Sequence, residues 1–312
     1  MGTSSSIGIV GLGNMGGAMA RHLVDENWDV VGFDVDETIQ ETLGEYGVRI
    51  AESPAAVASC VDLVLTSLPN TQAVESVYLG EDSLASGADG DLIALEMSTI
   101  APDTTAEIAE SAESIRIIDA PLSGGPENAR IGKLTIMVGG DSSVSEIPRI
   151  QRAFDTLSGD VYYLGGLGAG HTTKLLNNQI GAISRAAAFE AAAIAAAQDV
   201  DWHAFLQVVS HSSGSSYQFR KRMPQLLNRD FEPGYTVEAG LKDLRLTLSM
   251  ADTLEAHTPL TSIVYELNKQ AFASGFDQEH ITALIKLYER SIDQEVRIDE
   301  PLDDDFLNWR DS

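Results

Sequence analysis

The feature that most constrains this chain is a group of glycines directly after an apolar segment. Residues 7–10 predict a strand, and before the next helical pattern come Gly11, Leu12, Gly13, Asn14, Met15 and Gly16. Gly11 permits a tight turn, Gly13 leaves room for a phosphate, and Gly16 lets the following helix pack closely. The amide-rich start of that helix favours an anion. The pattern therefore predicts a dinucleotide-binding βαβ unit, with a plain structural turn as the alternative.

The second apolar segment of the chain indicates which dinucleotide is bound. Residues 30–33 predict a strand that ends at Asp34, about twenty residues beyond the glycines, where an acid binds the hydroxyls of the adenosine ribose. Val35 and Asp36 follow, so there is no arginine to accept a 2′-phosphate, and two carboxylates would repel one. We therefore expect NAD as the cofactor and consider NADP disfavoured.

The length and the apolar pattern limit the class of protein. With 312 residues the chain has room for two domains, each with its own core. No apolar run approaches the roughly 20 residues needed to cross a bilayer, and the polar start lacks the features of a secretory signal. We expect a soluble, cytoplasmic protein with no membrane partner. The single Cys60 precludes an intramolecular disulfide, and its apolar neighbours predict that it is buried.

The charge balance is extreme. The chain has 47 acidic and 20 basic residues, for a net charge of −27, and the acids are spread over many segments. Such a field disfavours nucleic acid as a partner. Dense carboxylates with few lysines suit concentrated salt, in which their mutual repulsion is screened. We therefore hypothesise a high-salt-adapted cell, with an ordinary acidic cytosolic protein as the alternative.

The first half of the sequence predicts an α/β domain. Short segments rich in Val, Ile and Leu alternate with helical patterns, and their lack of strict alternation indicates parallel strands covered on both faces. Ser53-Pro54 and Ala101-Pro102 provide helix starts. The further predicted strands are residues 63–66, 92–95, 115–118, 134–138 and 161–163. We expect a doubly wound, parallel Rossmann sheet.

The pattern changes at a glycine-rich junction over residues 165–170. A long alanine-rich helix is predicted over residues 171–198, and helical periodicity without a convincing strand continues to about residue 295. We therefore predict a Rossmann domain over residues 1–165, an all-helical domain over 166–295 and an exposed acidic extension over 296–312. The long helix would join the two domains.

A second glycine-rich motif follows the predicted strand over residues 115–118. Ligands bind beyond the carboxyl ends of parallel strands, so its place is suitable for a site. Ser123 offers a hydroxyl, while Gly124 and Gly125 allow backbone amides to converge on an anion. The motif suits a small carboxylate, and a strand-terminal turn is the alternative.

The start of the long helix carries a lysine and an amide on one face. Lys174 and Asn178 are four residues apart, so a lysine that exchanges a proton and an amide that orients a substrate would be neighbours. A solvated lysine is the alternative. His171 lies one turn earlier, and we interpret it as a rim residue. Residues 241–246, taken alone, read as an ordinary helix with a charged pair. The histidines and the cysteine lack metal-ligand spacing, so we expect no metal.

Taken in order, these motifs resemble the β-hydroxyacid dehydrogenase family, especially its 3-hydroxyisobutyrate dehydrogenase and tartronate semialdehyde reductase branch. The resemblance extends from about Ser6 to Glu295. It rests on GLGNMG at 11–16, LPN at 68–70, STIAP at 98–102, DAPLSGGPENARIGKLTIMVGG at 119–140, GAGHTTKLLNN at 168–178 and LKDLRLTL at 241–248.

The resemblance implies specific roles for these residues. Lys174 would be the catalytic general acid and base. The substrate carboxylate and a neighbouring oxygen would be bound by Ser123, Gly124, Gly125 and Asn178. Leu68, Pro69 and Thr99 would line the nicotinamide side, and Lys242 would reach the cofactor or the edge of the site. The family fold is a Rossmann domain followed by a helical domain, usually in homodimers or homotetramers.

The function expected from the resemblance is reversible hydride transfer between NAD and a small 3-hydroxy carboxylate. We expect 3-hydroxyisobutyrate as the substrate, with tartronate semialdehyde (2-hydroxy-3-oxopropionate) or another small β-hydroxyacid as the alternative. An imine reductase is disfavoured, because such relatives generally replace the lysine that stands here at 174. A non-catalytic dinucleotide-binding protein is disfavoured by the presence of Ser123, Lys174 and Asn178. Residues 212–217 are candidates for the pocket around the C2 substituent.

Overall fold

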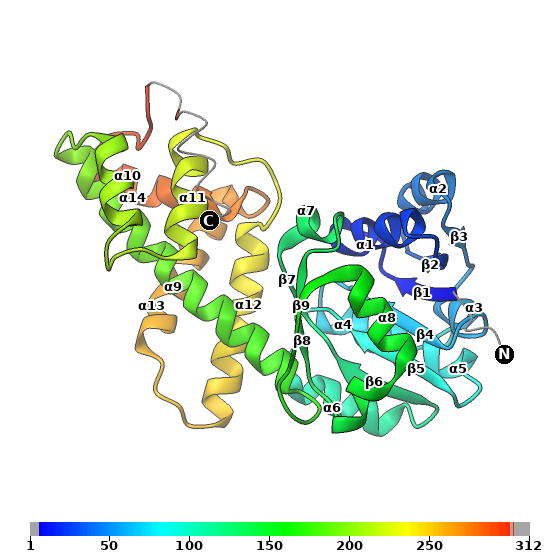
Figure 1. Cartoon of the computed structure of the whole chain (residues 1–312). Coiled ribbons are helices and arrows are strands. Elements are labelled where there is room, and N and C mark those ends of the chain that lie inside the picture. The colour runs from blue at the N-terminus through cyan, green and yellow to red at the C-terminus, as the bar shows by residue number, and fades with distance from the viewer. Residues whose placement is uncertain (1–5, 300–301, 303–312) are drawn as a thin grey trace. The chain divides into compact units, whose positions relative to one another are not determined.

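The computed structural model describes residues 6–299 and residue 302. The chain divides into two compact units, the first ending at Lys174 and the second beginning at Leu175, and the order of their elements can be followed by colour in Figure 1. The elements before the long helix are β1 (Ser6–Val10), α1 (Asn14–Asp25), β2 (Asp29–Phe33), α2 (Glu37–Tyr46), β3 (Arg49–Ile50), α3 (Pro54–Ala58), β4 (Leu63–Thr66), α4 (Thr71–Leu79), α5 (Leu84–Gly87), β5 (Leu92–Glu96), α6 (Pro102–Ser111), β6 (Ile115–Asp119), β7 (Leu122–Ser123), α7 (Gly125–Ala129), β8 (Leu134–Val138), the short 3₁₀ helix η1 (Ser142–Glu146), α8 (Pro148–Leu157) and β9 (Ser158–Tyr163).

The main sheet of the first unit is parallel throughout. Its six strands lie in the order β3-β2-β1-β4-β5-β6, so the predicted doubly wound sheet is confirmed. The chain moves outward from β1 in one direction and, after β3, returns to β4 on the other side of β1. The carboxyl ends of β1 and β4 therefore form the switch point at which such sheets bind ligands.

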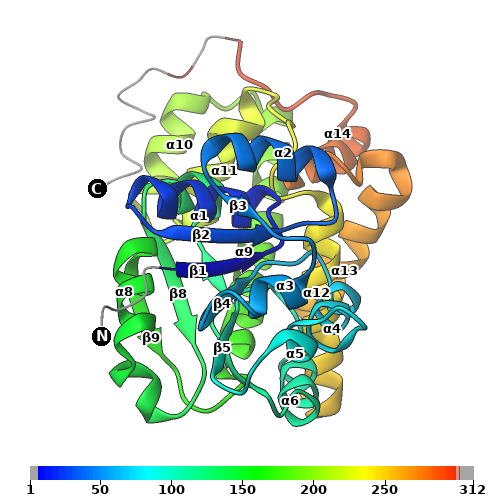
Figure 2. The same ribbon diagram turned by 90° about the vertical axis from the view of Figure 1, so that its right-hand side faces the viewer.

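Both faces of this sheet are covered, as their apolar content requires. Ile7 and Ile9 face a core built with α1 and α8, whereas Val10 faces a second core built with α3, α4 and α6. Figure 2 shows helices of the first unit on both sides of its sheet. The local helix signals are also correct: the Ser53 side chain caps α3, and Pro102 is the first residue of α6.

Two of the predicted strands do not belong to the main sheet. β8 and β9, which we predicted as its further members, form a separate three-stranded sheet in the order β7-β8-β9. β7 pairs antiparallel with β8, and β9 is largely exposed, with Tyr162 54% accessible. The prediction is wrong here because the two-residue strand β7 reverses the chain after β6, and a strand that short leaves no periodic pattern.

The second unit is helical, as predicted. All strands among the described residues precede Gly165, and an isolated bridge joins Thr236 and His280. Its elements are α9 (Ala169–Ala197, which begins in the first unit), α10 (Trp202–Ser210), α11 (Tyr217–Leu227), α12 (Val237–Thr253), α13 (Pro259–Ala271), the π-helical turn η2 (Phe272–Phe276), the 3₁₀ helix η3 (Ile281–Leu284) and α14 (Ile285–Ile292). Phe189 and Ala192 of α9 pack in its core with Phe219 and Met223 of α11.

The long helix α9 corrects one expectation. It has 29 residues with a mean hydropathy of 1.4 in its most apolar stretch, so by length and composition it could cross a bilayer, contrary to our prediction. The cause is the alanine content, which raises hydropathy without large side chains. Half of that stretch is buried, and Phe189 and Ala192 pack in a protein core. A core helix of a soluble protein has the same properties, so the helix is weak evidence for a membrane.

Two smaller expectations concern exposure. Cys60, predicted to be buried, is exposed, because it precedes the inward-facing Val61 at a turn before β4. In the predicted acidic extension, Val296 and Leu302 are buried in the core of the helical unit. Residues 300–301 and 303–312 of that extension lie outside the described residues.

Candidate active site

The glycine loop between β1 and α1 lies at the switch point of the main sheet. The Gly11 amide donates to the Phe33 carbonyl at 2.9 Å, and Gly11 has a φ of +88°. A Cβ added to Gly11 would lie 2.3 Å from the Ser67 carbonyl oxygen, just beyond β4. Both the left-handed backbone and the close approach of the β4 loop therefore require glycine at this position.

The next two glycines differ in what surrounds them. A Cβ added to Gly16, in the first turn of α1, would lie 1.8 Å from the Gly11 carbonyl oxygen, so the helix packs directly on the loop. At Gly13, by contrast, an added Cβ would meet no atom within 4 Å. Gly13 is the N-cap of α1 and provides no side-chain cap, while Asn14 and Met15 begin the helix. Uncapped amides beside an open surface fit the pyrophosphate of a dinucleotide.

Asp34 lies at the same edge of the sheet, directly after β2. Its Oδ2 accepts a hydrogen bond from the Leu12 amide at 2.6 Å, and its Oδ1 accepts one from the Asp36 amide at 3.0 Å. The carboxylate is therefore held against the glycine loop, where the sequence pattern expects it. Asp36 caps α2 by accepting from Thr38 N, which keeps a second carboxylate nearby.

The loops after β4 and β5 are joined by a buried carboxyl group that the sequence did not single out. Leu68 N donates to Ser98 Oγ at 2.8 Å, and Ser98 N donates to Glu96 Oε1 at 2.7 Å. Glu96 is 1% exposed, and its Oε2 accepts from Thr66 Oγ1 at 2.6 Å. Burial raises the pKa of Glu96, which the hydrogen bonds from Ser98 and Thr66 oppose.

The hydrogen bonds of Glu96 also position the two loops that we predicted to line the nicotinamide. Pro69 follows Leu68 and precedes Asn70, the N-cap of α4, while Thr99 follows Ser98. Glu96 therefore fixes the loop that carries Leu68 and Pro69 to the loop that carries Thr99. The only sequence signal was a single acid at the end of the apolar segment LIALE.

The second glycine motif forms an open turn after β7. Ser123 pairs with Thr135 of β8, and Gly124 and Gly125 have φ values of +134° and +78°. A Cβ added to Gly125 would meet no atom within 4 Å. The backbone here is thus in a conformation that favours glycine and has open space beside it, as a carboxylate-binding loop requires.

The start of α9 is held by a buried aspartate. Asp119, at the end of β6, is 0% exposed, and its two carboxylate oxygens accept from Gly168 N at 2.8 Å and His171 N at 2.9 Å. These donors belong to the first turn of the helix, whose amides lack intrahelical partners. Asp119 therefore anchors the helix three residues before Lys174, within the first unit.

His171 was interpreted as a rim residue, and this is wrong. It is 0% exposed, with Nδ1 2.8 Å from Thr105 Oγ1 and Nε2 3.1 Å from the Ser98 carbonyl oxygen. Because a carbonyl only accepts, Nε2 carries a proton and donates to Ser98. The helix periodicity places His171 near the Lys174 face but does not reveal that α6 and the loop before it contact its ring.

Asn178 and Lys242 meet at one carboxylate in the second unit. Asp243 of α12 is buried, and its Oδ2 accepts from Asn178 Nδ2 at 2.8 Å and from the Tyr235 hydroxyl at 2.7 Å. Its Oδ1 lies 3.3 Å from Lys242 Nζ. The segment read alone as an ordinary charged helix therefore positions an amide of α9. The only sequence signal for Asp243 was its place in the segment LKDL at 241–244.

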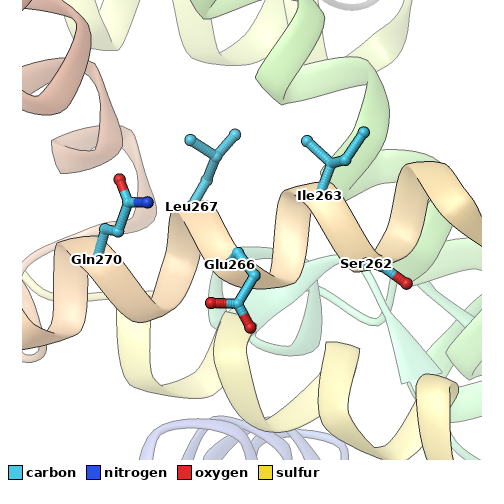
Figure 3. A pocket seen from close by; sticks show the side chains of 5 residues that line it. All are labelled: Ser262, Ile263, Glu266, Leu267 and Gln270. Atoms are coloured by element: carbon cyan, nitrogen blue, oxygen red, sulfur yellow. The ribbon is translucent and has the colours of Figure 1, made fainter.

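A surface pocket elsewhere in the second unit contains none of these groups. Figure 3 shows it on α13, where Ile263 and Leu267 provide its apolar side chains; the full lining is Ser262, Ile263, Glu266, Leu267 and Gln270. Its carboxylate, Glu266, is paired with Lys269 at 3.0 Å. Among residues 6–299 and 302, no group of three or more His, Cys, Asp or Glu side chains could hold a metal ion.

Comparisons with known proteins agree with this arrangement. Residues 6–165 match the family model described as the NAD binding domain of 6-phosphogluconate dehydrogenase. Residues 168–288 match the model described as NAD-binding of NADP-dependent 3-hydroxyisobutyrate dehydrogenase. The chain belongs to the β-hydroxyacid dehydrogenase family. It is thus an oxidoreductase with a nicotinamide-dinucleotide-binding domain, and the family resemblance read from the sequence is confirmed.

Individual members of this family resemble the chain over nearly its whole length. The 2-(hydroxymethyl)glutarate dehydrogenase of Eubacterium barkeri is 31% identical over 92% of this chain and 96% of its own. The 3-hydroxyisobutyrate dehydrogenase of Pseudomonas aeruginosa is 32% identical over 91% and 98%. The solved structure of 3-hydroxyisobutyrate dehydrogenase from Mycobacterium tuberculosis with L-serine has a TM-score of 0.82 at 28% identity, over 91% and 99%.

Proposed function

We propose that this β-hydroxyacid dehydrogenase transfers hydride reversibly between a small 3-hydroxy carboxylate and NAD. The observation that carries the proposal is the anchored start of α9. Asp119 holds the amides of Gly168 and His171, so Lys174 extends from a fixed helical turn in the unit that also contains the glycine loop. A group that exchanges protons with a bound alcohol needs such a fixed origin, because catalysis depends on positioning.

The residues of the first unit would hold the cofactor. The amides around Gly13 would bind its pyrophosphate, the Asp34 carboxylate would bind the ribose hydroxyls, and the loops at Leu68, Pro69 and Thr99 would line the nicotinamide. Bound NAD supplies the hydride acceptor for oxidation and, when reduced, the donor for the reverse reaction. The remaining chemistry belongs to protein groups.

Those groups would bind the substrate and move one proton. Ser123 and the amides of Gly124 and Gly125 would bind the substrate carboxylate, and Asn178, held by Asp243, would orient a neighbouring oxygen. Lys174 would take the hydroxyl proton during oxidation and return it to the carbonyl oxygen during reduction. Lys174 must therefore be neutral for part of the cycle, which closeness to a cationic nicotinamide would promote.

The substrate proposed is 3-hydroxyisobutyrate, supported by the names of the Pseudomonas and Mycobacterium relatives. The second candidate class is other small β-hydroxyacids, including 2-(hydroxymethyl)glutarate and tartronate semialdehyde, since a relative at 31% identity carries the former name. An NADH absorbance assay with 3-hydroxyisobutyrate, 2-(hydroxymethyl)glutarate, glycerate, threonate and serine tests the proposal. Turnover of at least one acid is expected. NADH binding without any turnover would instead support a non-catalytic protein.

NAD rather than NADP is proposed because the carboxylates of Asp34 and Asp36 would repel a 2′-phosphate. Asp34→Asn keeps an oxygen for the Leu12 amide but removes the charge. The variant should raise KM for NAD and lower the NAD/NADP ratio of kcat/KM by about tenfold, since one charged hydrogen bond is worth about 1.5–3 kcal/mol. An unchanged ratio would contradict the role of Asp34.

Cytoplasmic location, a high-salt cell and a homodimeric or homotetrameric state complete the proposal. The net charge of −27 supports salt adaptation, because screening by molar salt would relieve the repulsion among carboxylates. Thermal unfolding in increasing KCl should give a rising Tm, and equal stability in dilute buffer would contradict the adaptation. Analytical ultracentrifugation in the same salt series tests the oligomeric state.

A further inference from the structure

The second unit contains a buried arginine without a polar partner. Arg185 of α9 is 3% exposed, and among the residues that the structure describes it makes no hydrogen bond or ion pair. Its guanidinium carbon lies 6.0 Å from the centre of the Tyr235 ring. Most buried polar groups are hydrogen-bonded, and an unpaired buried charge costs several kcal/mol. A chain with 47 acidic residues does not lack carboxylates that could have paired with it.

Other cationic groups share this region of the helical unit. Burial lowers the pKa of Arg185 to about 10, so the guanidinium stays charged at neutral pH, and Arg222 of α11 also lowers it. The pKa of His280 is lowered to about 3, first by burial and then by Arg222, Arg185 and Lys221. Lys221 lies over the Tyr217 ring at 5.8 Å. Several cationic side chains therefore gather in this region of an acidic protein.

The carboxylate that acts on Arg185 is shared with other groups. Asp243 Oδ2 accepts from Asn178 and Tyr235, while Asp243 Oδ1 accepts no hydrogen bond among the described residues and lies 3.3 Å from Lys242 Nζ. Its charge is also balanced by Lys242, 3.3 Å away. Arg185 therefore retains donors for an anion that the described part of the protein does not supply.

The helix geometry connects Arg185 to Asn178. Asn178, Gly181 and Arg185 are spaced by three and four residues, so they share one face of α9. Gly181 lies between the other two on this face and has no side chain. Gln218 of α11 lies over the same glycine: an added Cβ would be 3.1 Å from its Nε2. Its Oε1 is buried without a hydrogen bond.

The spacing between Asn178 and Arg185 also sets the length of a ligand that could contact both residues. Seven residues separate Asn178 from Arg185, which is about 10 Å along a helix, and the backward tilt of a long arginine side chain shortens this span. Tyr235 bridges the interval, because its ring lies under the guanidinium and its hydroxyl bonds the same Asp243 oxygen as Asn178. A molecule a few carbons longer than a minimal hydroxyacid would reach both groups.

We propose that Arg185, flanked by Gln218, binds a second carboxylate of the substrate, which favours the 3-hydroxy dicarboxylates of the second candidate class over 3-hydroxyisobutyrate. This rests on the proposed function for the reacting end of the molecule. The planar guanidinium fork matches a carboxylate in two parallel hydrogen bonds, which a lysine cannot provide. The Gln218 amide adds a further hydrogen-bond donor, and the charge of Lys221 adds to the selection of an anion.

A binding experiment tests the site without catalysis. Thermal unfolding of the full chain is followed with increasing glutarate, pentanoate or inorganic phosphate, with ionic strength held constant by KCl. Glutarate should raise Tm more than pentanoate, and Arg185→Met should weaken its apparent Kd at least about tenfold. Equal glutarate binding by Arg185→Met, or tighter binding of phosphate than of glutarate to the wild type, would overturn the proposal.

Two further variants make this result interpretable. Arg185→Met replaces an unpaired buried charge by an apolar chain of similar length, so its ligand-free Tm should equal or exceed that of the wild type. Arg185→Lys keeps the charge without the fork and should bind glutarate with intermediate affinity. The matched control is Arg245→Met at an exposed position of α12, which should bind glutarate as the wild type does.

Kinetic measurements then distinguish the proposed role of Arg185 in substrate binding from the proposed dehydrogenase reaction. The ratio of kcat/KM for 2-(hydroxymethyl)glutarate to that for 3-hydroxyisobutyrate should fall by about 10- to 100-fold in Arg185→Met and stay constant in Arg245→Met. An unchanged ratio in Arg185→Met would overturn the second-carboxylate role. Glutarate binding that depends on Arg185, without turnover of either acid, would support the anion site and contradict the proposed function instead.

Discussion

Two buried carboxylates of the first unit and a buried arginine of the second unit differ in how their charges are satisfied. In the first unit, Glu96 and Asp119 are almost fully buried, and each of their four carboxylate oxygens accepts a hydrogen bond from within the unit. In the second unit, the equally buried Arg185 has no such partner among the described residues. The two carboxylates of the first unit are satisfied by the loops that they position, whereas our proposal assigns the unused donors of Arg185 to a ligand.

The difference has opposite energetic consequences. Removing a satisfied carboxylate leaves its buried donors unpaired, which destabilises the fold. Removing an unsatisfied cation relieves a desolvation cost, which stabilises the fold but removes the ligand contact. Stability measurements on single variants can therefore distinguish positioning groups from binding groups, even before a substrate is known.

The largest effect is expected at Asp119. Asp119→Leu would leave the amides of Gly168 and His171 buried without an acceptor, so the free energy of unfolding should fall by about 3–5 kcal/mol. Asp119→Asn keeps one acceptor oxygen and should cost less. Urea unfolding followed by circular dichroism measures both. A loss below about 1 kcal/mol in Asp119→Leu would break the proposed contrast between the units.

The pH dependence of the second unit should be set largely by His280. Its pKa is lowered in the folded state from 6.5 to about 3, so the unfolded chain binds the extra proton first. The contribution of neutral His280 to stability is therefore fully present above pH 6.5. Below that, the free energy of unfolding falls by about 1.4 kcal/mol per pH unit as the pH drops toward 3.

The matched variant for this test is His280→Asn. An asparagine oxygen can replace Nδ1 as the acceptor for Thr282 N while it removes the titration. At pH 5 the variant should be more stable than the wild type by about 2 kcal/mol, relative to their difference at pH 7.5. Parallel stability curves of the two proteins between pH 7.5 and pH 5 would show that His280 does not titrate in this way.

The smallest effect is expected at Glu96, with the opposite sign of pH dependence. Burial raises the pKa of Glu96 above 4.5, so the folded state binds the proton first as the pH falls. The free energy of unfolding therefore decreases as the pH rises from the unfolded pKa to the raised folded pKa. Relative to the wild type, Glu96→Gln should therefore gain stability as the pH rises from 4 to 7, because the glutamine carries no charge to bury. The advantage should vanish below the unfolded pKa. A difference in stability between the two proteins that stays constant from pH 4 to pH 7 would contradict the raised pKa of Glu96.

Local patterns in the sequence predicted the parts of this molecule that depend on neighbouring residues. The glycine loop after β1, Asp34 after β2, the alanine-rich α9 and the spacing of Lys174 and Asn178 all follow from a short stretch of chain. The sheet membership of β8 did not, because the reversal at β7 occupies two residues. The roles of three buried groups were also not predicted. Asp119 and Asp243 bind partners tens of residues away in the sequence, and Arg185 has no hydrogen-bond partner among the described residues, so a local sequence pattern could not indicate their roles.

The catalytic role of Lys174 is the central claim, and Lys174→Ala tests it most directly. The variant and the matched surface control Lys133→Ala are assayed with saturating NAD and the best substrate of the acid panel, and NADH binding is measured by fluorescence. Lys174→Ala should lose about 10²- to 10⁴-fold in kcat, as expected for a general acid and base, while it binds NADH like the control. A kcat within a few-fold of the control would contradict proton transfer by Lys174.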